Sequence, residues 1–131
     1  MKVNVASQRD DAIRMFIAQA EKDLANGYRV IVGGDFNEPS HRDWIEKNKN
    51  LYDHNGFVVP WTVTTLLEEA GFIDSYRKIY PNPLTHPGFT YPSDNLAKTP
   101  EKITWAPKAD ERDRICLLYT SDAADEARSV D

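Results

Sequence analysis

The first hydrophobic pattern along the chain has helical spacing. Apolar side chains recur three or four residues apart at Ile13, Phe16, Ile17, Ala20 and Leu24. Asp10 and Asp11 precede them, where a helix N-terminus favours negative charge, and Gly27 follows, where a glycine commonly ends a helix. The pattern predicts an amphipathic helix with one buried face.

Two more helices are predicted further along the chain. Residues 62–70 place their apolar side chains on one face and are followed by Gly71, which predicts a helix that ends there. The buried positions of this helix would be Val63, Leu66 and Leu67. Ser40, followed by Asp43, resembles an N-cap with an acidic first turn, which predicts a short helix through the next two residues, Trp44 and Ile45.

Strand-like segments lie between and after these helices. "YRVIV" is short and rich in β-branched residues, and we expect Gly33 and Gly34 to end it. "FIDSYRKIYPNP" closes on a Pro-Asn-Pro turn, and "GFTYP", "KITW" and "RICLLY" resemble short strands separated by polar loops. A sheet combined with helices predicts the α/β or α+β class.

Composition and charge exclude several classes of protein. The 131 residues are 40% hydrophobic, and no apolar run approaches the roughly 20 residues that span a bilayer, so we expect a soluble domain without a transmembrane segment. The single cysteine cannot form an internal disulfide. Most of the net charge of −5 lies in residues 110–131, and the nearly neutral remainder argues against broad nucleic-acid binding by a basic surface. Neither a compartment nor a protein partner is indicated.

The stretch "VIVGGDFNEPSH" contains the candidate catalytic residues. Its glycines would let a substrate approach the end of the strand closely. Asp35 and Asn37 are two residues apart, so their side chains point the same way if strand geometry continues. A carboxylate can orient or deprotonate a water, and a carboxamide can hold a phosphoryl oxygen as charge develops. This pairing predicts a phosphoester hydrolase.

Two other interpretations of this stretch stay open. Asp35 and Asn37 could simply form an Asx turn between a strand and a helix. Four side chains also follow positions 1, 3, 9 and 12 of an EF-hand calcium loop, namely Asp35, Asn37, Asp43 and Glu46. Against calcium, Pro39 and Ser40 stand where a ligand and a glycine belong, and the preceding segment is a strand instead of a helix.

Four ordered segments resemble the endonuclease/exonuclease/phosphatase superfamily, which includes DNase I-like nucleases, apurinic endonucleases, sphingomyelinases and inositol-phosphate phosphatases. "GDFN" at residues 34–37 looks like the family signature. "GFIDSYRKIYPNP" at 71–83 is similar to the segment that follows it in apurinic endonucleases, and "GFTY" at 88–91 resembles the next strand. "DRI" at 113–115 looks like the start of the family's Arg-Ile-Asp strand, so the resemblance spans about residues 9–115.

The resemblance implies roles for individual residues. Asp35 matches the aspartate that orients or activates the attacking water, and Asn37 matches the asparagine that contacts the scissile phosphate. Both would lie in or beside the metal site as ligands of Mg²⁺, with Mn²⁺ or Ca²⁺ as alternatives, and the metal would polarise the phosphoryl oxygens. Thr90 and Tyr91 would line or support the substrate pocket. For Tyr91, as for Phe89, a place among the core aromatics of the sheet is an equally good prediction.

Several polar residues outside these matches receive a structural role or none. Asp74 and Arg77 are one turn apart on a predicted short helix, so we expect a structural pair. His41 is predicted to be a surface histidine in the first turn of a helix. His54 and His86 are not assigned a role.

The resemblance also implies a fold and a domain boundary. The family fold is a four-layer α/β/β/α sandwich, and residues 1–115 match its C-terminal portion. The family's metal-binding glutamate, an early asparagine and a histidine would precede Met1, and Cys116 replaces the aspartate of the Arg-Ile-Asp strand. Residues 116–131, which contain no terminal Asp-His pair, fit nothing in the pattern and are expected to be a non-native or disordered tail. We expect such a fragment to be poorly stable and inactive by itself, with open sheet edges and an uncovered apolar sheet face.

The predicted function is therefore that of a fragment of a metal-dependent phosphodiesterase or nuclease. Water would attack phosphorus with the help of the metal, and the partner would be a phosphoester substrate, with nucleic acid among the candidates. The alternative is a non-catalytic binding module, with either a degenerate hydrolase fold or an acidic calcium-binding loop.

Overall fold

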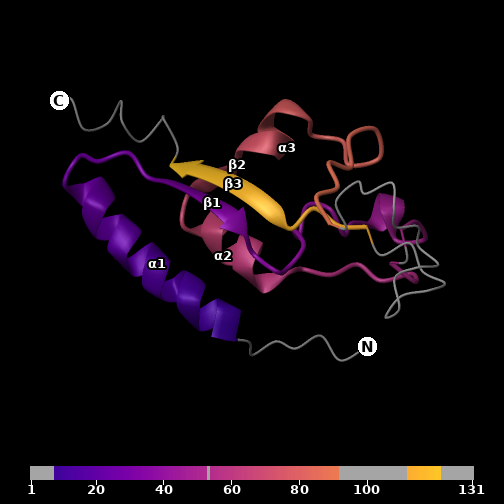
Figure 1. The fold of residues 1–131 in the computed structure, drawn as a ribbon, viewed down its shortest axis with the longest axis horizontal. Coiled ribbons are helices and arrows are strands. Elements are labelled where there is room, and N and C mark those ends of the chain that lie inside the picture. The colour runs from indigo at the N-terminus through magenta and orange to yellow at the C-terminus, as the bar shows by residue number, and fades with distance from the viewer. Residues whose placement is uncertain (1–7, 53, 92–111, 122–131) are drawn as a thin grey trace.

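The computed structural model describes residues 8–52, 54–91 and 112–121, which combine helices with a small sheet (Figure 1). In chain order the elements are α1 (Gln8–Ala25), β1 (Ile31–Asp35), the 3-10 helix η1 (Glu46–Asn48), α2 (Thr62–Glu69), β2 (Phe72–Asp74), α3 (Ser75–Ile79) and β3 (Cys116–Ser121). The described chain is therefore of the α+β class. None of its helices is long and apolar enough to cross a membrane.

The strand that comes last in the sequence lies in the middle of the sheet. The strand order is β1-β3-β2, and β3 runs antiparallel to both neighbours. This corrects the expected boundary before Cys116, because Cys116–Ser121 is the central strand and not part of a disordered tail. The sequence also predicted a short strand at "RICLLY", which overlaps β3. Residues 122–131 lie outside the described part of the chain.

The core forms where α1 and α2 cover one face of the sheet. Apolar side chains from both helices meet side chains from β2 and β3, and the buried members are Ile13, Ala20, Val63, Leu67, Phe72, Leu117 and Tyr119. The rings of Phe16 and Phe72 lie 5.7 Å apart between centroids and tie α1 to β2. Burying each of these larger side chains contributes roughly 1.5–3 kcal/mol, so this single interface holds the described fold together.

The opposite face of the sheet is open among the described residues. Partners across an antiparallel pair point to the same face, and the pair Val32–Tyr119 points into the core. Ile31 and Leu118 therefore point the other way, and they are 68% and 48% exposed. The pair Asp35–Cys116 shares this open face.

Both long helices agree with the sequence predictions. α1 contains all the predicted apolar positions, and Gly27 follows it in the left-handed conformation at φ +85°. α2 spans Thr62–Glu69 and is followed by Gly71 at φ +92°. In both cases an apolar face and a terminal glycine were sufficient to predict the helix.

Two local predictions were wrong, and a third is untested. Gly33 and Gly34 do not end the first strand but belong to β1, where a Cβ on Gly33 would lie 3.1 Å from the Leu118 side chain. "GFTYP" forms only an isolated bridge between Tyr91 and Asp113 in place of a strand. "KITW" lies outside the described residues.

The short helix predicted through Trp44 and Ile45 is also absent. Ser40 accepts a hydrogen bond from the Arg42 N–H, as an N-cap would, but the chain then turns, and η1 begins only at Glu46. The reason is the side chain of Asn48, which binds the backbone on both sides of Trp44: it accepts from the Ile45 N–H and donates to the Asp43 carbonyl. These contacts hold the backbone in an open turn.

Candidate functional site

The candidate site begins where β1 ends. The Asn37 N–H donates to Asp35 Oδ1 at 2.8 Å, and Asn37 is in the left-handed conformation at φ +50°, which asparagine tolerates better than most residues. The Asx turn considered from the sequence is therefore present. The turn leaves the Asp35 and Asn37 side chains exposed to solvent, where a ligand could reach them.

Thr90 and the start of β3 lie beside this turn. The Phe36 N–H donates to the Ile115 carbonyl at 2.8 Å, and Thr90 Oγ1 accepts from the N–H groups of Ile115 and Cys116 at 2.9 and 3.0 Å. The Thr90 hydroxyl is thus occupied in holding the start of β3. Tyr91 is exposed and forms the isolated bridge to Asp113, shortly before β3 begins.

The side chains that alternate with Asp35 and Asn37 point inward. The Phe36 ring stacks on Tyr119 with centroids 6.3 Å apart, and Glu38 and Ser40 are buried. Glu38 Oε1 accepts from the Val63 N–H of α2 at 3.1 Å. Burial raises the pKa of the Glu38 carboxyl above its usual range.

Asp35 and Asn37 fit a magnesium site only in part. Asp35 supplies one carboxylate, of which Oδ1 is held by the turn, and Asn37 supplies a carboxamide. In the described residues no three His, Cys, Asp or Glu side chains gather as a metal-binding group. Mg²⁺ commonly takes one or two protein carboxylates and completes its octahedron with waters and substrate phosphate. Asp35 and Asn37 could therefore supply the few protein ligands that such a site requires.

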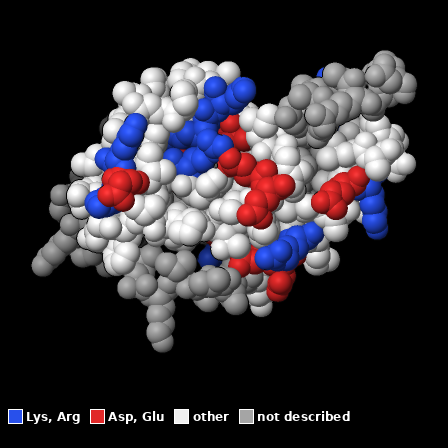
Figure 2. Space-filling view, turned by 180° about the vertical axis from the view of Figure 1, so that it is seen from behind, with Lys and Arg blue, Asp and Glu red and all other residues white. Residues whose placement is uncertain are grey.

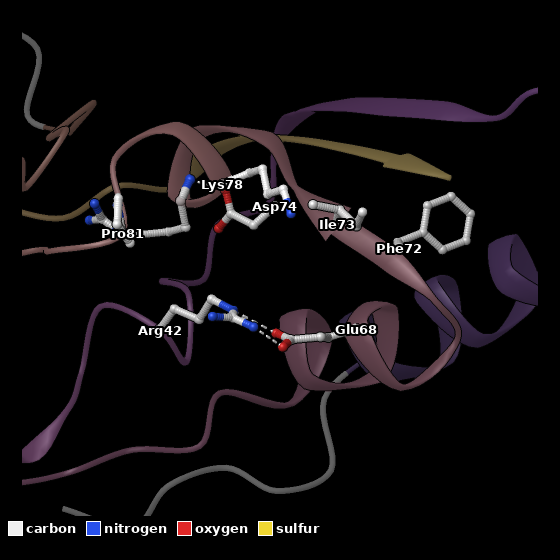
Figure 3. A pocket seen from close by; sticks show the side chains of 8 residues that line it. Arg42, Glu68, Phe72, Ile73, Asp74, Lys78 and Pro81 are labelled. Atoms are coloured by element: carbon white, nitrogen blue, oxygen red, sulfur yellow. Dashed lines mark hydrogen bonds and ion pairs between the residues drawn. The ribbon is translucent and has the colours of Figure 1, made fainter. Parts of the chain in front are cut away.

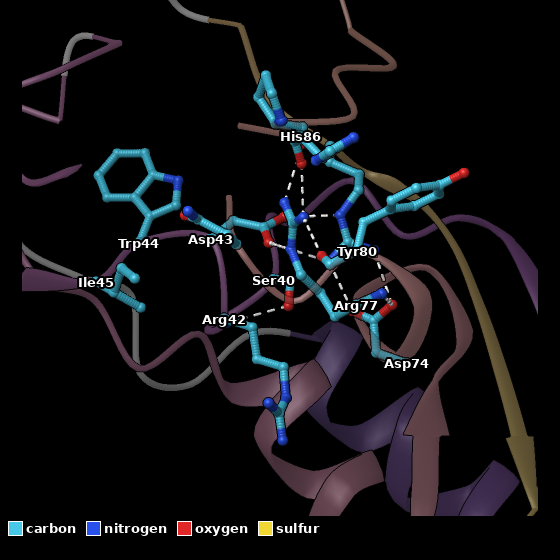
Figure 4. A network of polar contacts seen from close by, with 12 residues as sticks. Ser40, Arg42, Asp43, Trp44, Ile45, Asp74, Arg77, Tyr80 and His86 are labelled. Carbon is cyan, nitrogen blue, oxygen red and sulfur yellow. Dashed lines mark hydrogen bonds and ion pairs between the residues drawn. The ribbon is translucent and has the colours of Figure 1, made fainter. Parts of the chain in front are cut away.

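A buried ionic network includes Asp43, Asp74 and Arg77 (Figure 4). Asp43 accepts from Arg77 Nε at 2.7 Å through Oδ1 and from Arg114 Nε at 2.8 Å through Oδ2. Arg114 also donates to both oxygens of Asp74, at 2.6 and 3.0 Å. Burial alone would lower the pKa of the Arg114 guanidinium, but the hydrogen bonds to Asp74 and Asp43 outweigh it and raise that pKa.

This network changes two interpretations of the sequence. Asp74 and Arg77 were predicted to be a structural pair, and they do meet, but Asp74 caps α3 by accepting from the Arg77 backbone N–H. The Arg77 guanidinium instead binds Asp43 and the carbonyls of Tyr80, His86 and Pro87. Because two guanidinium groups occupy both oxygens of Asp43, the calcium-loop alternative loses one of its four ligands.

His41 is not the surface histidine that was predicted. Its side chain is only 20% exposed, Nδ1 lies 2.7 Å from Thr64 Oγ1, and Nε2 lies 2.7 Å from Glu68 Oε2. Burial lowers the pKa of the His41 imidazole, although Glu68 opposes this effect. Both ring nitrogens are engaged by the protein, which leaves neither for a phosphate.

The two unassigned histidines have aromatic partners. His54 is buried and stacks on the Trp44 ring with centroids 3.9 Å apart. His86 stacks on Tyr80 at 4.5 Å, and its carbonyl accepts from Arg77. Their positions indicate packing roles.

A hollow of about 360 Å³ lies away from the candidate site, beside α2, β2 and α3 (Figure 3). The ion pair between Arg42 and Glu68 forms one side of it, and Lys78 projects from the other. Neither Asp35 nor Asn37 lines this hollow. Its size is typical of a small-molecule pocket, but the cations that line it, Arg42, Arg77 and Lys78, do not belong to the turn that carries the hydrolase-like residues.

Charges of both signs are interspersed on the face shown in Figure 2, where groups of Lys and Arg side chains adjoin Asp or Glu. This mixed surface agrees with the nearly neutral charge of residues 1–109.

Comparison with known proteins gives one informative likeness. The chain is 44% identical over 90 residues to an uncharacterized protein of Caenorhabditis elegans. The matched segment covers 69% of this chain and 27% of that protein, so the chain corresponds to about a quarter of this relative's length. No protein-family profile and no solved structure matches the sequence.

Proposed function

We propose that this chain is part of a metal-dependent phosphoester hydrolase in which the Asp35 turn is the catalytic loop. One observation carries the proposal. The Asx turn leaves the Asp35 carboxylate and the Asn37 carboxamide exposed two residues apart, and Asp35 ends β1 on the open face of the sheet. By contrast, the nearby carboxylates of Asp43 and Asp74 are neutralised by guanidinium groups.

Each residue of the turn has a defined task in this proposal. Asp35 Oδ1 is fixed by the Asn37 N–H, and the second carboxylate oxygen is directed to the attacking water, which it orients and deprotonates. The Asn37 side chain donates to a phosphoryl oxygen of the substrate as negative charge develops. A divalent metal held by Asp35 and Asn37 would act as a Lewis acid on the phosphoryl group. Thr90 supports the site by holding the start of β3 against the turn.

The same proposal extends to the fold. The exposed Ile31 and Leu118 side chains pack, in the longer protein, against a second sheet, which completes a four-layer α/β/β/α sandwich. The relative from Caenorhabditis elegans is several times longer than the matched segment, which is consistent with such a partner in one chain. The remaining catalytic groups would come from that second half.

The activity test uses a full-length protein that contains this segment. We expect magnesium-dependent hydrolysis of bis(p-nitrophenyl) phosphate, and we expect Asp35→Asn and Asn37→Ala each to lower kcat by roughly 10²–10³-fold. Glu69→Gln, on the exposed side of α2, is the matched control and should leave turnover unchanged. Turnover within about threefold of the unmodified protein in both loop variants, judged against that control, would contradict the proposal.

Metal binding can be tested on the same full-length protein. Mn²⁺ broadens NMR signals of nearby nuclei even when it binds weakly, so substoichiometric Mn²⁺ should broaden the amide signals of residues 35–37 first. Asp35→Asn should remove this selective broadening. Broadening that begins elsewhere, or that persists in the variant, would mean that the turn is not the metal site.

A non-catalytic binding module is the second candidate, and one observation favours it. Cys116 faces Asp35 across the β1–β3 pair, where the resemblance leads us to expect an aspartate. If the full-length protein folds but hydrolyses none of the phosphomonoesters and phosphodiesters offered, Cys116→Asp becomes the deciding variant. Activity that appears only in Cys116→Asp would identify a hydrolase fold that has lost a catalytic carboxylate.

A further inference from the structure

The loop that follows β1 passes from exposed to buried residues just after Asn37. Asp35 and Asn37 are exposed, whereas Glu38, Pro39 and Ser40 are buried. The left-handed φ of Asn37 breaks the strand geometry at this point. A non-glycine residue in that conformation persists when its surroundings determine it. The question is which contact on the far side of Asn37 does so.

Glu38 makes the first such contact. Its side chain is 5% exposed, and Oε1 accepts from the Val63 N–H, while Oε2 lies 3.6 Å from Arg9 Nε on α1. The residue immediately after Asn37 is thereby attached to two helices. On the near side, the Phe36 N–H is bound to the Ile115 carbonyl.

α2 needs this contact as much as the loop does. The first N–H groups of a helix have no partner within the helix, and a side chain at the N-cap usually binds one of them. The N-cap residue of α2 is Trp61, which provides no side-chain hydrogen bond. The Glu38 carboxylate takes that place from a distant part of the sequence, at the end of the helix where negative charge is favoured.

We propose that Glu38 is the positioning residue of the catalytic loop: by capping α2 from outside the helix, it fixes the backbone on which Asp35 and Asn37 are presented. The effect on catalysis rests on the proposed function. The mechanical link, by which Glu38 holds the loop backbone against α2, does not. Glu38 is buried and turned away from the open face, so it acts through Asn37 and does not touch the substrate.

Backbone ¹⁵N relaxation of the full-length protein that contains this segment tests the mechanical link. In the unmodified chain the Asn37 and Val63 amides should have order parameters of about 0.85, typical of rigid backbone. Glu38→Ala should lower both, with Asn37 falling below about 0.6. Glu38→Gln keeps an acceptor oxygen for the Val63 N–H and should restore most of the order. Glu69→Ala, at an exposed position of the capped helix, is the control and should change neither amide.

The outcomes separate the positioning role from a merely structural one. Loss of order at Val63 with Asn37 unchanged in Glu38→Ala would overturn the inference, because the cap would then stabilise α2 without holding the loop. If Glu38→Ala does not fold, Glu38→Gln decides. Its weaker, uncharged acceptor should then lower the order of Asn37 and Val63 together, and an effect on Val63 alone would again overturn the inference.

Kinetics of the full-length protein test the catalytic consequence. Glu38→Ala should lower kcat about tenfold or more with KM nearly unchanged, and Glu38→Gln should recover most of kcat. If the unmodified protein shows no hydrolysis, the proposed function fails, while the relaxation measurement still decides whether Glu38 holds the loop. A rise in KM alone would contradict a role in positioning the reacting groups.

Discussion

The buried ionic network and the Asp35 turn use similar side chains in opposite ways. In the network, Asp43 and Asp74 share the Arg114 guanidinium, Asp43 also binds Arg77, and both carboxylates are almost completely buried. In the turn, Asp35 is exposed, and within the described residues its hydrogen-bond partner is the Asn37 N–H. The first arrangement engages both oxygens of each carboxylate to hold loops together. The second engages Oδ1 of Asp35 and presents the carboxylate to solvent.

The comparison shows how to separate structural from functional carboxylates in this chain. Removing one member of the network leaves a buried charge without a partner, so the cost falls on stability. Removing the Asp35 charge leaves nothing buried, so the cost should fall on binding and catalysis. Four experiments, ordered by expected effect on stability, test this division.

The largest effect is expected for Arg114→Met. This change leaves the carboxylates of Asp43 and Asp74 buried with one guanidinium fewer, and breaking a buried pair in this way costs about 3–5 kcal/mol of unfolding free energy. Urea denaturation followed by circular dichroism measures it. Arg42→Met breaks the partly exposed pair with Glu68 and should cost about 1 kcal/mol or less. Equal losses of unfolding free energy in the two variants would mean that the buried network contributes no more to stability than the partly exposed ion pair.

Gly88→Ala should have the next largest effect. Gly88 has φ +68°, and a Cβ there would lie 2.6 Å from Cε1 of Tyr76, a ring that faces the guanidinium groups of Arg77 and Arg114. Gly71→Ala is the matched control, because φ is +92° there but no atom lies within 4 Å of the added Cβ. We expect Gly88→Ala to cost about 1–3 kcal/mol more than Gly71→Ala in the same denaturation experiment. A smaller difference would show that the Tyr76 ring moves easily.

A smaller effect should appear as a pH dependence at His41. Because burial lowers the pKa of His41 in the folded protein, the unfolded chain binds the proton more strongly. The unfolding free energy should therefore fall as pH drops through the ordinary imidazole pKa of about 6.5, and level off below the folded pKa. The pKa of Glu68 is lowered chiefly by its hydrogen bond from Arg42, so its contribution is lost only at more acidic pH.

Urea denaturation between pH 8 and pH 5.5 measures how the unfolding free energy changes over the range in which His41 titrates. His41→Gln should flatten the dependence over this range, because a carboxamide does not titrate. His86→Gln provides a control at an exposed histidine. An unchanged slope in His41→Gln would assign the dependence to another group.

The smallest effect on stability is expected for Asp35→Asn. The new carboxamide still offers an oxygen to the Asn37 N–H, and no charge is buried, so the unfolding free energy should stay within about 0.5 kcal/mol. The same substitution at Asp74 should cost about 1–3 kcal/mol, because Arg114 then loses an ionised partner. If Asp35→Asn proved as destabilising as Asp74→Asn, the turn would be a structural element and the proposed function would lose its main support.

The helices could be predicted from sequence because their signals are local. Ile13 and Ala20 in α1 and Val63 and Leu67 in α2 recur at the period of a helix, and each helix has a glycine at its end. The strand character of β3 was also visible in "RICLLY". Its central place was not, because strand order depends on pairing between segments far apart in sequence.

Non-local contacts also explain what the sequence did not reveal around the site. Asp35 and Asn37 could be singled out from their spacing and resemblance, and the Asx turn was one of the alternatives. The two partners of Asp43 lie 34 and 71 residues away, and the helix capped by Glu38 lies 25 residues away, so no local pattern indicates them. His41 was misjudged for the same reason, since Thr64 and Glu68 that enclose it come from α2.

The central position of β3 has a consequence for synthesis on the ribosome. Val30, just before β1, and Ser121, at the end of β3, are hydrogen-bonded neighbours separated by 91 residues. At about 5–20 residues per second, the ribosome makes the first roughly 5 to 20 s before the second. Until then β1 and β2 have no strand between them, and α1 and α2 have no complete sheet to cover. The nascent chain therefore completes this sheet only after its final described strand has emerged from the exit tunnel.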